Sequence, residues 1–416
     1  MLVAVLGQGY VGLPLSIAMA SGGHEVHAVD TDATRYRSLV DCRSYIVDVT
    51  DADLRRETAA GRFTPAASLA AVPAADAYII AVPTPLDAEQ VPDLRHLDAA
   101  VTAVAAHAVR GALVMVESTI YPGAMRDHVA PLFERLSGLV PGEDVYLGYS
   151  PDRVDPGRGW TLEKIPKLVS GLGEESDAAA AKLYESVFEQ VVRVPSCEVA
   201  EFAKLLENTF RYLNIAFANE LCRASRALDI SFRDVVSAAA SKPFGFMAFH
   251  PGPGVGGHCL PNNVHYLNHA LAKVGQPSVL LDQAARINDG MPRYSVDRLD
   301  TALSRKGKAI AGSTVLLLGL AFKGGVSDAR NSPTLRVAEL LAAEGAVVKV
   351  ADPWVERFPA TPTFDMVELS HEEVSTADAV VLMTDHDQID YDAVLATADV
   401  VLDCRGKLRH AEVEQL

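Results

Sequence analysis

The feature that most constrains the fold of this chain is a glycine-rich hexapeptide near its start. Gly7-Gln8-Gly9-Tyr10-Val11-Gly12 follows an apolar run over 2–6 and precedes a helical pattern over 13–20. In a strand–turn–helix unit, the first glycine permits the tight turn, the second lets the backbone approach a diphosphate, and the third allows close helix packing. A second apolar run over 25–29 ends at Asp30, whose carboxylate suits ribose hydroxyls and repels a 2′-phosphate. The unit predicts an NAD site, with Arg35 beside the adenosine ribose or the diphosphate; the alternative is a phosphate-free turn in a generic α/β domain.

Strand-like and helix-like patterns alternate on both sides of a long helical stretch. Apolar runs over 77–82 and 112–116 continue the first alternation, and a second one begins at Ser313. Between them, from Glu198 to about Asp229, apolar residues recur every three or four positions, namely Phe202, Leu205, Leu206, Phe210, Leu213, Phe217 and Leu221. Because strands that alternate with helices form parallel sheets, we predict an α/β protein in which two Rossmann-like parallel-sheet domains are joined by a long-helix central domain. The expected boundaries are 1–197, 198–305 and 306–416, which suits a length of 416 residues.

The amino-acid composition argues against several classes of binding partner. The 37 Lys and Arg residues against 54 Asp and Glu residues give a net charge of −17, which argues against nucleic-acid binding. No apolar run approaches the roughly 18 residues that span a bilayer, and the start of the chain lacks a basic region. We therefore expect no membrane segment and no secretory signal. The five cysteines are widely spaced without a CxxC pair, which predicts no disulfide framework, no metal site and a cytoplasmic location.

Two segments carry candidate chemistry. Lys204 and Asn208 lie four residues apart on the long helix, where they are either solvated or donors to an anionic intermediate. The loop Pro251–Pro261 places several glycines before Cys259, so that a thiol lies on a backbone able to approach a ligand closely. The neighbouring His258 invites a metal or Cys/His-protease interpretation. Neither is supported, because one Cys and one His are too few ligands and adjacent side chains point apart.

A series of short motifs occurs in order along essentially the whole chain. They are GQGYVGLPL at 7–15, VPTPL at 82–86, EST at 117–119, SPDRVDPG at 150–157, AEFAKLLENTFRYLNIAFANEL at 200–221, SKPFGF at 241–246, PGPGVGGHCLP at 251–261, LAFKGGVSDARNSP at 320–333 and TDH at 384–386. With them the chain resembles the UDP-glucose/GDP-mannose dehydrogenase superfamily. SKPFGF together with GGHC is most similar to its UDP-N-acetylhexosamine 6-dehydrogenase branch.

The resemblance implies an activity and a set of site residues. Such enzymes oxidise C6 of a nucleotide-linked sugar to a carboxylate with two NAD⁺, through a cysteine thiohemiacetal and thioester. It implies Cys259 as the nucleophile, Lys204 and Asn208 as stabilisers of oxyanions, and Thr119 as the residue that orders a water. The other implied NAD contacts are Val82, Pro83, Thr84, Ser118 and Arg330. The implied substrate contacts are Lys204, Asn208, Phe249, Gly256, Phe322, Lys323 and Arg405.

Two departures from the family pattern leave the chemistry open. Asp152 stands where the family has Glu, and Asn263 stands where it has Asp. An Asp side chain reaches less far by one methylene, and an amide accepts no proton. The leading expectation is the full four-electron oxidation of a UDP-sugar. The alternatives are an enzyme on this scaffold with truncated or altered chemistry, and a nucleotide-sugar-binding protein without turnover. We also expect a homodimer formed through the helix over 198–229, as in the family, because the central region has more apolar surface than one subunit buries.

Overall fold

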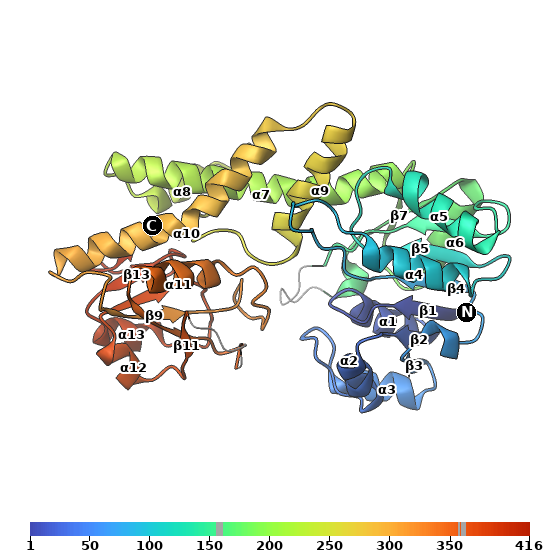
Figure 1. Cartoon of the computed structure of the whole chain (residues 1–416), viewed down its shortest axis with the longest axis horizontal. Coiled ribbons are helices and arrows are strands. Elements are labelled where there is room, and N and C mark those ends of the chain that lie inside the picture. Colours follow the sequence, from blue (N-terminus) through green and yellow to red (C-terminus); the bar gives the residue numbers. More distant parts are fainter. Residues whose placement is uncertain (155–160, 357, 359–362) are drawn as a thin grey trace. The chain divides into compact units, whose positions relative to one another are not determined.

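The computed structural model describes residues 1–154, 161–356, 358 and 363–416. The last three residues of the motif at 150–157 therefore lie outside the described residues. The chain divides into two compact units, which are Met1–Glu207 with His265–Pro277 and Asn208–Val264 with Ser278–Leu416. Figure 1 labels most of the helices and strands of both.

The first unit is built on an eight-stranded sheet with the order β3-β2-β1-β4-β5-β6-β7-β8. All neighbouring strands are parallel except β6 and β7, which are antiparallel. The strands are β1 (Leu2–Leu6), β2 (Glu25–Val29), β3 (Phe63–Ala66), β4 (Ala77–Ile80), β5 (Leu113–Val116), β6 (Tyr146–Tyr149), β7 (Lys167–Gly171) and β8 (Val191–Arg193). The helices are α1 (Gly12–Ser21), α2 (Ala33–Val40), α3 (Asp51–Ala59), α4 (Arg95–Ala105), α5 (Ala130–Ser137) and α6 (Glu174–Glu185), with short turns η1 (Leu69–Ala71), η2 (Met125–Val129) and η3 (Leu162–Lys164).

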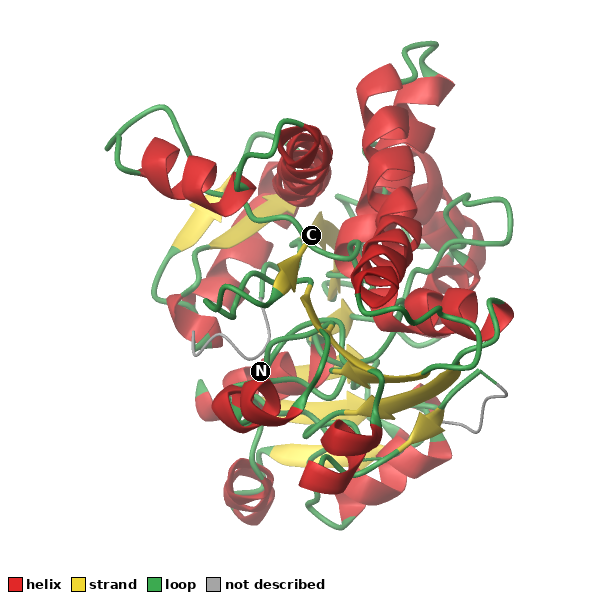
Figure 2. Cartoon of the chain, turned by 90° about the vertical axis from the view of Figure 1, so that its left-hand side faces the viewer, coloured by secondary structure: helices red, strands yellow, loops and turns green. Residues whose placement is uncertain are grey.

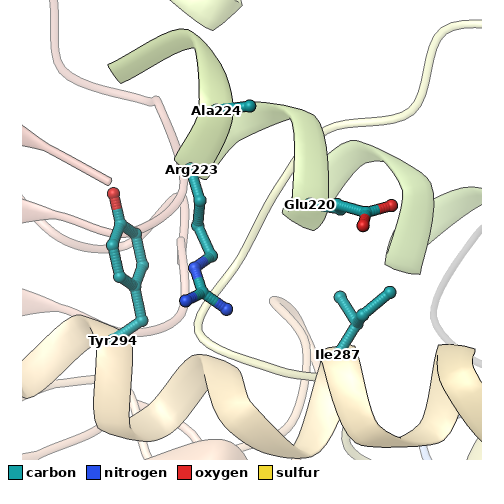
Figure 3. A pocket seen from close by; sticks show the side chains of 5 residues that line it. All are labelled: Glu220, Arg223, Ala224, Ile287 and Tyr294. Carbon is teal, nitrogen blue, oxygen red and sulfur yellow. The ribbon is translucent and has the colours of Figure 1, made fainter. Parts of the chain in front are cut away.

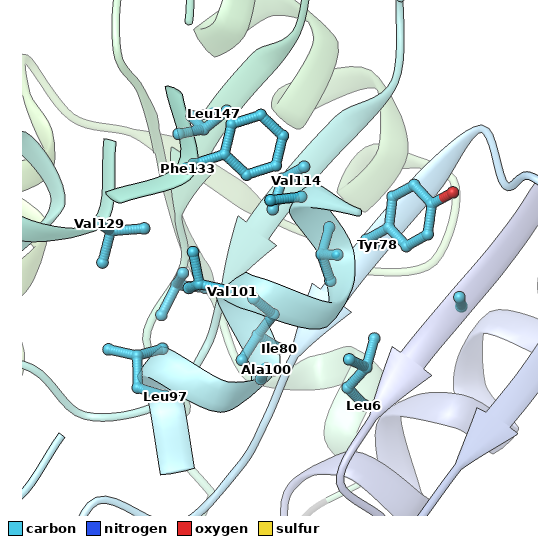
Figure 4. Packing of buried hydrophobic residues seen from close by; sticks show 14 of the residues in the cluster. Leu6, Tyr78, Ile80, Leu97, Ala100, Val101, Val114, Val129, Phe133 and Leu147 are labelled. Atoms are coloured by element: carbon cyan, nitrogen blue, oxygen red, sulfur yellow. The ribbon is translucent and has the colours of Figure 1, made fainter. Parts of the chain in front are cut away.

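Alternation along β1 distributes its side chains between two hydrophobic cores. Val3 and Val5 pack in a core with residues of α1 and α6. Ala4 belongs to a second core on the other face, with Leu97 of α4 and Phe133 of α5. Figure 4 shows this second core, in which side chains of α4 and α5 meet those of β4 and β5. Both faces of the sheet are therefore covered, as a parallel sheet requires.

The second unit repeats this plan with a six-stranded parallel sheet of order β11-β10-β9-β12-β13-β14. Its strands are β9 (Thr314–Leu318), β10 (Val347–Ala351), β11 (Asp365–Met366), β12 (Ala379–Leu382), β13 (Val401–Asp403) and β14 (Glu414–Gln415). Val315 and Leu317 face a core with α10 (Val279–Arg305) and α11 (Pro333–Ala343), whereas Leu316 and Leu318 face α12 (His371–Thr376) and α13 (Tyr391–Thr397). In Figure 2, which colours the whole chain by secondary structure, helices lie on both sides of the strands.

The central region is helical. The long helix α7 (Cys197–Ala227) crosses the unit boundary between Glu207 and Asn208, and α8 (Phe232–Ala240), α9 (Cys259–Lys273) and α10 complete the region. The predicted fold class, two Rossmann-like sheets with a long-helix region between them in sequence, is confirmed. The loop predicted over 251–261 ends earlier than expected, because α9 already begins at Cys259. None of the helices in the described part of the chain is long and apolar enough to cross a lipid bilayer.

Candidate active site

The glycine loop has the geometry that the sequence predicts. Gly7 adopts a φ of 91°, and a Cβ on it would lie 2.6 Å from the carbonyl oxygen of Ala81. A Cβ on Gly12 would lie 1.8 Å from the Gly7 carbonyl oxygen, so only glycine fits at either position. A Cβ on Gly9 would meet only the Arg35 guanidinium, at 4.0 Å, which leaves the loop open above this residue. Val11 caps α1 without a side-chain hydrogen bond, so no side chain of the cap competes for the first N–H groups of α1.

The carboxylate of Asp30 closes the turn from the end of β2. It accepts hydrogen bonds from the backbone N–H of Gln8 at 2.8 Å and of Asp32 at 2.9 Å. Nη1 of Arg35 lies 3.5 Å from the same carboxylate, so the two predicted residues are neighbours. Tyr45 completes the group, because its hydroxyl donates to the Gln8 carbonyl at 2.8 Å and its ring lies 6.0 Å from the Arg35 guanidinium carbon. Burial raises the pKa of Tyr45 well above its usual value, which keeps this hydroxyl a donor.

Two loops at the carboxyl ends of β4 and β5 are tied together. The Ser118 hydroxyl donates to the Val82 carbonyl at 2.7 Å, and the Thr84 hydroxyl donates to the Thr119 carbonyl at 2.8 Å. The Tyr266 hydroxyl donates in turn to the Thr84 carbonyl at 3.0 Å. The structure therefore brings together the predicted NAD contacts over 82–84 with Ser118 and Thr119, at the sheet edge where dinucleotides bind in this topology.

Lys204 reaches the loop that carries Asp152. Nζ of Lys204 donates to the main-chain carbonyl of Asp152, and the Asp152 carboxylate accepts from the backbone N–H of Val154 at 3.3 Å. Lys204 is buried, so the sequence alternative of a solvated lysine is excluded. The helix α7 thus holds an ammonium group against the predicted catalytic loop.

A buried cluster that the sequence did not predict supports these loops. Lys167 donates to the Glu117 carboxylate at 2.6 Å and approaches the Pro151 carbonyl at 3.4 Å, and the Tyr184 hydroxyl donates to Glu117 at 2.6 Å. Burial raises the pKa of Glu117, against the opposing effect of Lys167. The cluster links Glu117, two residues before Thr119, to Pro151, the residue before Asp152. In the sequence, the EST motif at 117–119 was the only indication of this cluster.

The thiol of Cys259 lies in the second unit, at the first residue of α9, and it is exposed. The loop before it packs against the segment over 320–331. The Gly257 N–H donates to the Arg330 carbonyl at 3.0 Å, and the Asn331 amide donates to the Gly257 carbonyl at 3.2 Å. A Cβ on Gly256 would lie 2.8 Å from Cβ of Phe322, so glycine is required for this approach.

Two asparagine amides of the second unit are buried without a hydrogen-bond partner for Nδ2. They belong to Asn208 and to Asn263, which is one turn beyond Cys259 on α9. An unpaired buried N–H donor is costly in a protein that offers it no ligand. Both positions are predicted site residues, and both present a donor.

The predicted substrate residues of the second unit are partly assembled. Arg405 donates to the carbonyls of Met383 at 2.6 Å and Phe322 at 3.4 Å, and Nζ of Lys323 lies 5.9 Å from the ring of Phe322. Phe249 packs edge-on against Phe210 with ring centroids 6.0 Å apart. Arg330, expected to reach NAD, forms a bidentate pair with Asp328.

The predicted catalytic residues divide between the two units. Thr119, Asp152 and Lys204 belong to the first, and Asn208, Cys259 and Asn263 to the second. A separate cavity of about 510 Å³ lies between α7 and α10 and is lined by Glu220, Arg223, Ala224, Ile287 and Tyr294 (Figure 3). None of the predicted site residues is among these five. Within the described residues, no group of three or more His, Cys, Asp or Glu side chains is arranged to hold a metal ion.

Comparison with known proteins decides the family. Three family models match in order: the NAD-binding domain of the UDP-glucose/GDP-mannose dehydrogenase family over residues 1–192, its central domain over 198–290 and its UDP-binding domain over 316–410. The chain belongs to this family. The resemblance predicted from the motifs is confirmed, and the chain is an NAD-dependent oxidoreductase.

Relatives that are named for different UDP-sugar or NDP-sugar substrates show almost the same sequence identity to the chain. A UDP-N-acetyl-D-glucosamine 6-dehydrogenase of Salmonella typhi is 34% identical, with 93% of this chain and 90% of the relative covered. An NDP-N-acetyl-D-galactosaminuronic acid dehydrogenase of Ralstonia solanacearum is 33% identical, with 97% and 95% covered. The solved structure of a UDP-D-ManNAc dehydrogenase of Pyrococcus horikoshii superposes with a TM-score of 0.91 at 31% identity, covering 100% of this chain and 99% of that one.

The residues of the first unit fit NAD, the cofactor of this dehydrogenase family. The open space above Gly9 admits a diphosphate at the start of α1, and Asp30 offers a carboxylate to ribose hydroxyls. Tyr45 and Arg35 border the same turn.

Proposed function

We propose that this chain oxidises the C6 hydroxyl of a UDP-sugar, a UDP-N-acetylhexosamine or UDP-glucose, to the uronic acid in two hydride transfers through a thiohemiacetal and a thioester of Cys259. The observation that carries the proposal is the placement of Cys259. Its thiol is exposed at the end of the glycine loop, whereas burial raises the pKa of Cys197 to about 12, of Cys222 to about 11 and of Cys404 to about 12. Thiols of that kind are poor nucleophiles at neutral pH.

In the first half of the proposed reaction, Cys259, Lys204 and Asn208 would act on C6 of the sugar. NAD, when bound, would supply the acceptor for one hydride from C6 in each oxidation, so two equivalents would be consumed. In the first oxidation the C6 hydroxyl loses its proton and C6 loses a hydride, which leaves an aldehyde. The Cys259 sulfur then forms a bond to C6, and the resulting alkoxide is stabilised by donors from Lys204 and Asn208.

The second oxidation and the hydrolysis of the thioester complete the proposed reaction. Loss of hydride from the thiohemiacetal carbon gives a thioester, and a water ordered by Thr119 attacks it. The C–S bond breaks, the acid leaves, and the thiol is regenerated. Asp152 is proposed as the base that takes the proton of this water, and the buried ammonium of Lys204 beside its carbonyl supports that placement.

The remaining site residues are proposed to hold the ligands. Val82, Pro83, Thr84, Ser118 and Arg330 join the glycine loop around NAD. Phe249, Gly256, Phe322, Lys323 and Arg405 bind the UDP-sugar. The half-buried Arg405 guanidinium donates to the neutral carbonyls of Met383 and Phe322, which leaves its charge available for a diphosphate. The division into domains 1–197, 198–305 and 306–416, a homodimer through α7 and a cytoplasmic location complete the proposal.

A second candidate rests on Asn263. An amide cannot act as a base, and its buried, unpaired Nδ2 suits donation to an oxyanion better than activation of water. On this alternative the enzyme stops after one hydride transfer or stalls at the thioester.

One experiment separates the two. The protein is incubated with NAD⁺ and a panel of UDP- and GDP-sugars, and NADH per sugar consumed is measured together with the intact protein mass. Two NADH per sugar with an acid product supports the full oxidation. One NADH with an aldehyde, or a persistent acyl adduct on Cys259, favours the alternative, and no NADH across the panel contradicts both.

A further inference from the structure

The second unit contains a turn that repeats the NAD turn of the first. Gly319 follows β9 as Gly7 follows β1, with φ values of 96° and 91°. The Gly319 N–H donates to the Ala351 carbonyl at 2.8 Å, and the Gly7 N–H donates to the Val29 carbonyl at the same distance. Asp352 follows β10 as Asp30 follows β2. Both carboxylates accept the N–H of the residue after the glycine, at 2.6 Å from Leu320 and 2.8 Å from Gln8.

The carboxylates of Asp30 and Asp352 differ in the number of hydrogen bonds that they already accept from the protein. Asp352 also accepts from the backbone N–H groups of Ala321 at 2.8 Å, Trp354 at 2.7 Å and Val355 at 3.0 Å. Nε2 of His386 lies 3.1 Å from Oδ2 of the same carboxylate, and both side chains are completely buried. Burial raises the pKa of Asp352, but the hydrogen bonds from His386 and the backbone outweigh it and bring this pKa to about 2. The carboxylate is therefore charged and has no accepting capacity left for a ribose.

The turn itself is also closed to a diphosphate. The Phe322 N–H donates to the Asp328 carbonyl at 2.9 Å, and α11 begins only at Pro333, whereas α1 begins at Gly12. A cavity of about 630 Å³ borders Asp352, and its described lining includes the acidic side chains Glu356 and Glu368 but no lysine or arginine. A second dinucleotide site at this turn, like the one at Gly7, is therefore disfavoured.

The same contacts fix the start of the 320–331 loop. The Gly325 N–H lies 3.4 Å from Nδ1 of His386, which makes Nδ1 the acceptor and Nε2 the donor to Asp352. The Thr384 hydroxyl donates to the Ala321 carbonyl at 2.6 Å. A Cβ on Gly324 would lie 2.1 Å from the Asp385 carbonyl, so the loop and the 384–386 segment meet backbone to backbone. Phe322 and Lys323 lie between these two anchored ends.

We propose that Asp352 and His386 form a positioning pair, which holds the 320–331 loop so that Phe322 and Lys323 bind the nucleotide part of the substrate and the Gly256–Gly257 backbone is fixed before Cys259. The pair acts through the loop and does not touch the substrate. This inference rests on the proposed function, because it takes Phe322 and Lys323 as substrate contacts.

The test compares substitutions of the His386 side chain. His386→Leu removes both ring contacts, whereas in His386→Gln the amide replaces the Nε2–H donor to Asp352. Tyr391→Phe is the matched control, because the Tyr391 hydroxyl accepts from the backbone N–H of His386 and not from its ring. Each variant is assayed for KM and kcat with the best UDP-sugar, KM for NAD⁺, affinity for UDP by calorimetry and NAD stoichiometry.

For His386→Leu we expect a rise of about tenfold in the Kd for UDP and in the KM for the UDP-sugar, with KM for NAD⁺ nearly unchanged. His386→Gln recovers part of this loss and Tyr391→Phe shows none. If His386→Leu fails to fold, His386→Gln alone must still weaken UDP more than NAD⁺. Unchanged UDP affinity in a folded His386 variant, or two NAD bound per chain, overturns the positioning pair. A wild-type protein that binds UDP without oxidising any UDP-sugar contradicts only the proposed function.

Discussion

Nζ of Lys167 and Oε2 of Glu117 lie 2.6 Å apart, and both side chains are almost completely buried. The ammonium also lies 5.3 Å from the ring of Tyr184, so the charge is enclosed by a carboxylate and aromatic surface. Such a pair is costly to break from one side, because the remaining charge is then buried without compensation.

Lys167→Met is expected to lower the free energy of unfolding by about 3–5 kcal/mol, because Glu117 loses its counter-ion. Chemical denaturation at pH 7 measures this loss. Lys164→Met, which removes an exposed charge nearby, should change stability by less than about 0.5 kcal/mol. Adding Glu117→Gln to Lys167→Met should recover part of the loss, and a single-variant cost below about 1 kcal/mol would contradict the prediction.

Glu201 makes stability depend on pH near neutrality. Its buried carboxyl accepts from the N–H groups of Gly123 at 2.6 Å and Met125 at 2.9 Å, yet burial prevails and raises its pKa from 4.5 to about 7. Between these two values the folded chain holds a proton that the unfolded chain releases. The free energy of unfolding of the wild type therefore falls as pH rises through this window, by about 3 kcal/mol relative to Glu201→Gln. Denaturation curves of both proteins from pH 5 to 8 test this, and a pH-independent difference would count against it.

Asp30 is expected to set the preference for NAD over NADP. Asp30→Asn keeps an oxygen that accepts from the Gln8 N–H but removes the charge that repels a 2′-phosphate. The ratio of kcat/KM for NAD⁺ to that for NADP⁺ should fall by about tenfold or more. Asp32→Asn removes the same charge two residues away and should leave the ratio nearly unchanged. Equal ratios in Asp30→Asn and the wild type would refute the assignment.

Asn263→Asp tests whether the missing carboxylate limits the chemistry. A general base contributes about 10²–10⁴-fold where it acts, so release of the acid should accelerate by about 10²-fold and acquire a pH-dependent limb. Asn262→Asp, on the neighbouring buried position of α9, controls for the cost of a buried carboxyl. Single-turnover kinetics with intact-mass detection of the Cys259 adduct provide the measurement. An unchanged rate would show that Asn263 does not limit hydrolysis.

The apolar face of α7 is expected to form a dimer. Phe210, Phe217 and Leu221 are 48%, 59% and 38% exposed and lie on the part of α7 in the second unit. Phe217→Glu should convert a dimer to a monomer at micromolar concentration in sedimentation equilibrium, because a charge on this face must lose its water in the interface. Leu136→Glu, at an exposed apolar residue of α5, should not change the mass. A wild type that sediments as a monomer would refute the dimer.

Local patterns explain how much of the fold was predictable. The strands over 2–6 and 25–29 and the glycines between them were predicted because alternation and glycine spacing are encoded over a few residues. Tyr45 and Lys167 were missed because their partners lie 37 and 50 positions away, so only the folded sheet reveals them. The helix pattern alone did not show whether Lys204 is buried, because polar residues four positions apart, such as Lys204 and Asn208, also occur on solvated helix faces.

The similar turns at Gly7 and Gly319 show that backbone shape alone does not identify a dinucleotide site in a dehydrogenase with two Rossmann-like domains. A template built from the strand, the left-handed glycine and the acidic residue would count two dinucleotide sites in this chain. The number of donors already bound to the acidic side chain separates them, with two backbone N–H groups and an arginine at Asp30 against four backbone N–H groups and an imidazole at Asp352. Hydrogen-bond occupancy of that carboxylate is thus a simple criterion for distinguishing a cofactor-binding lobe from its structural copy.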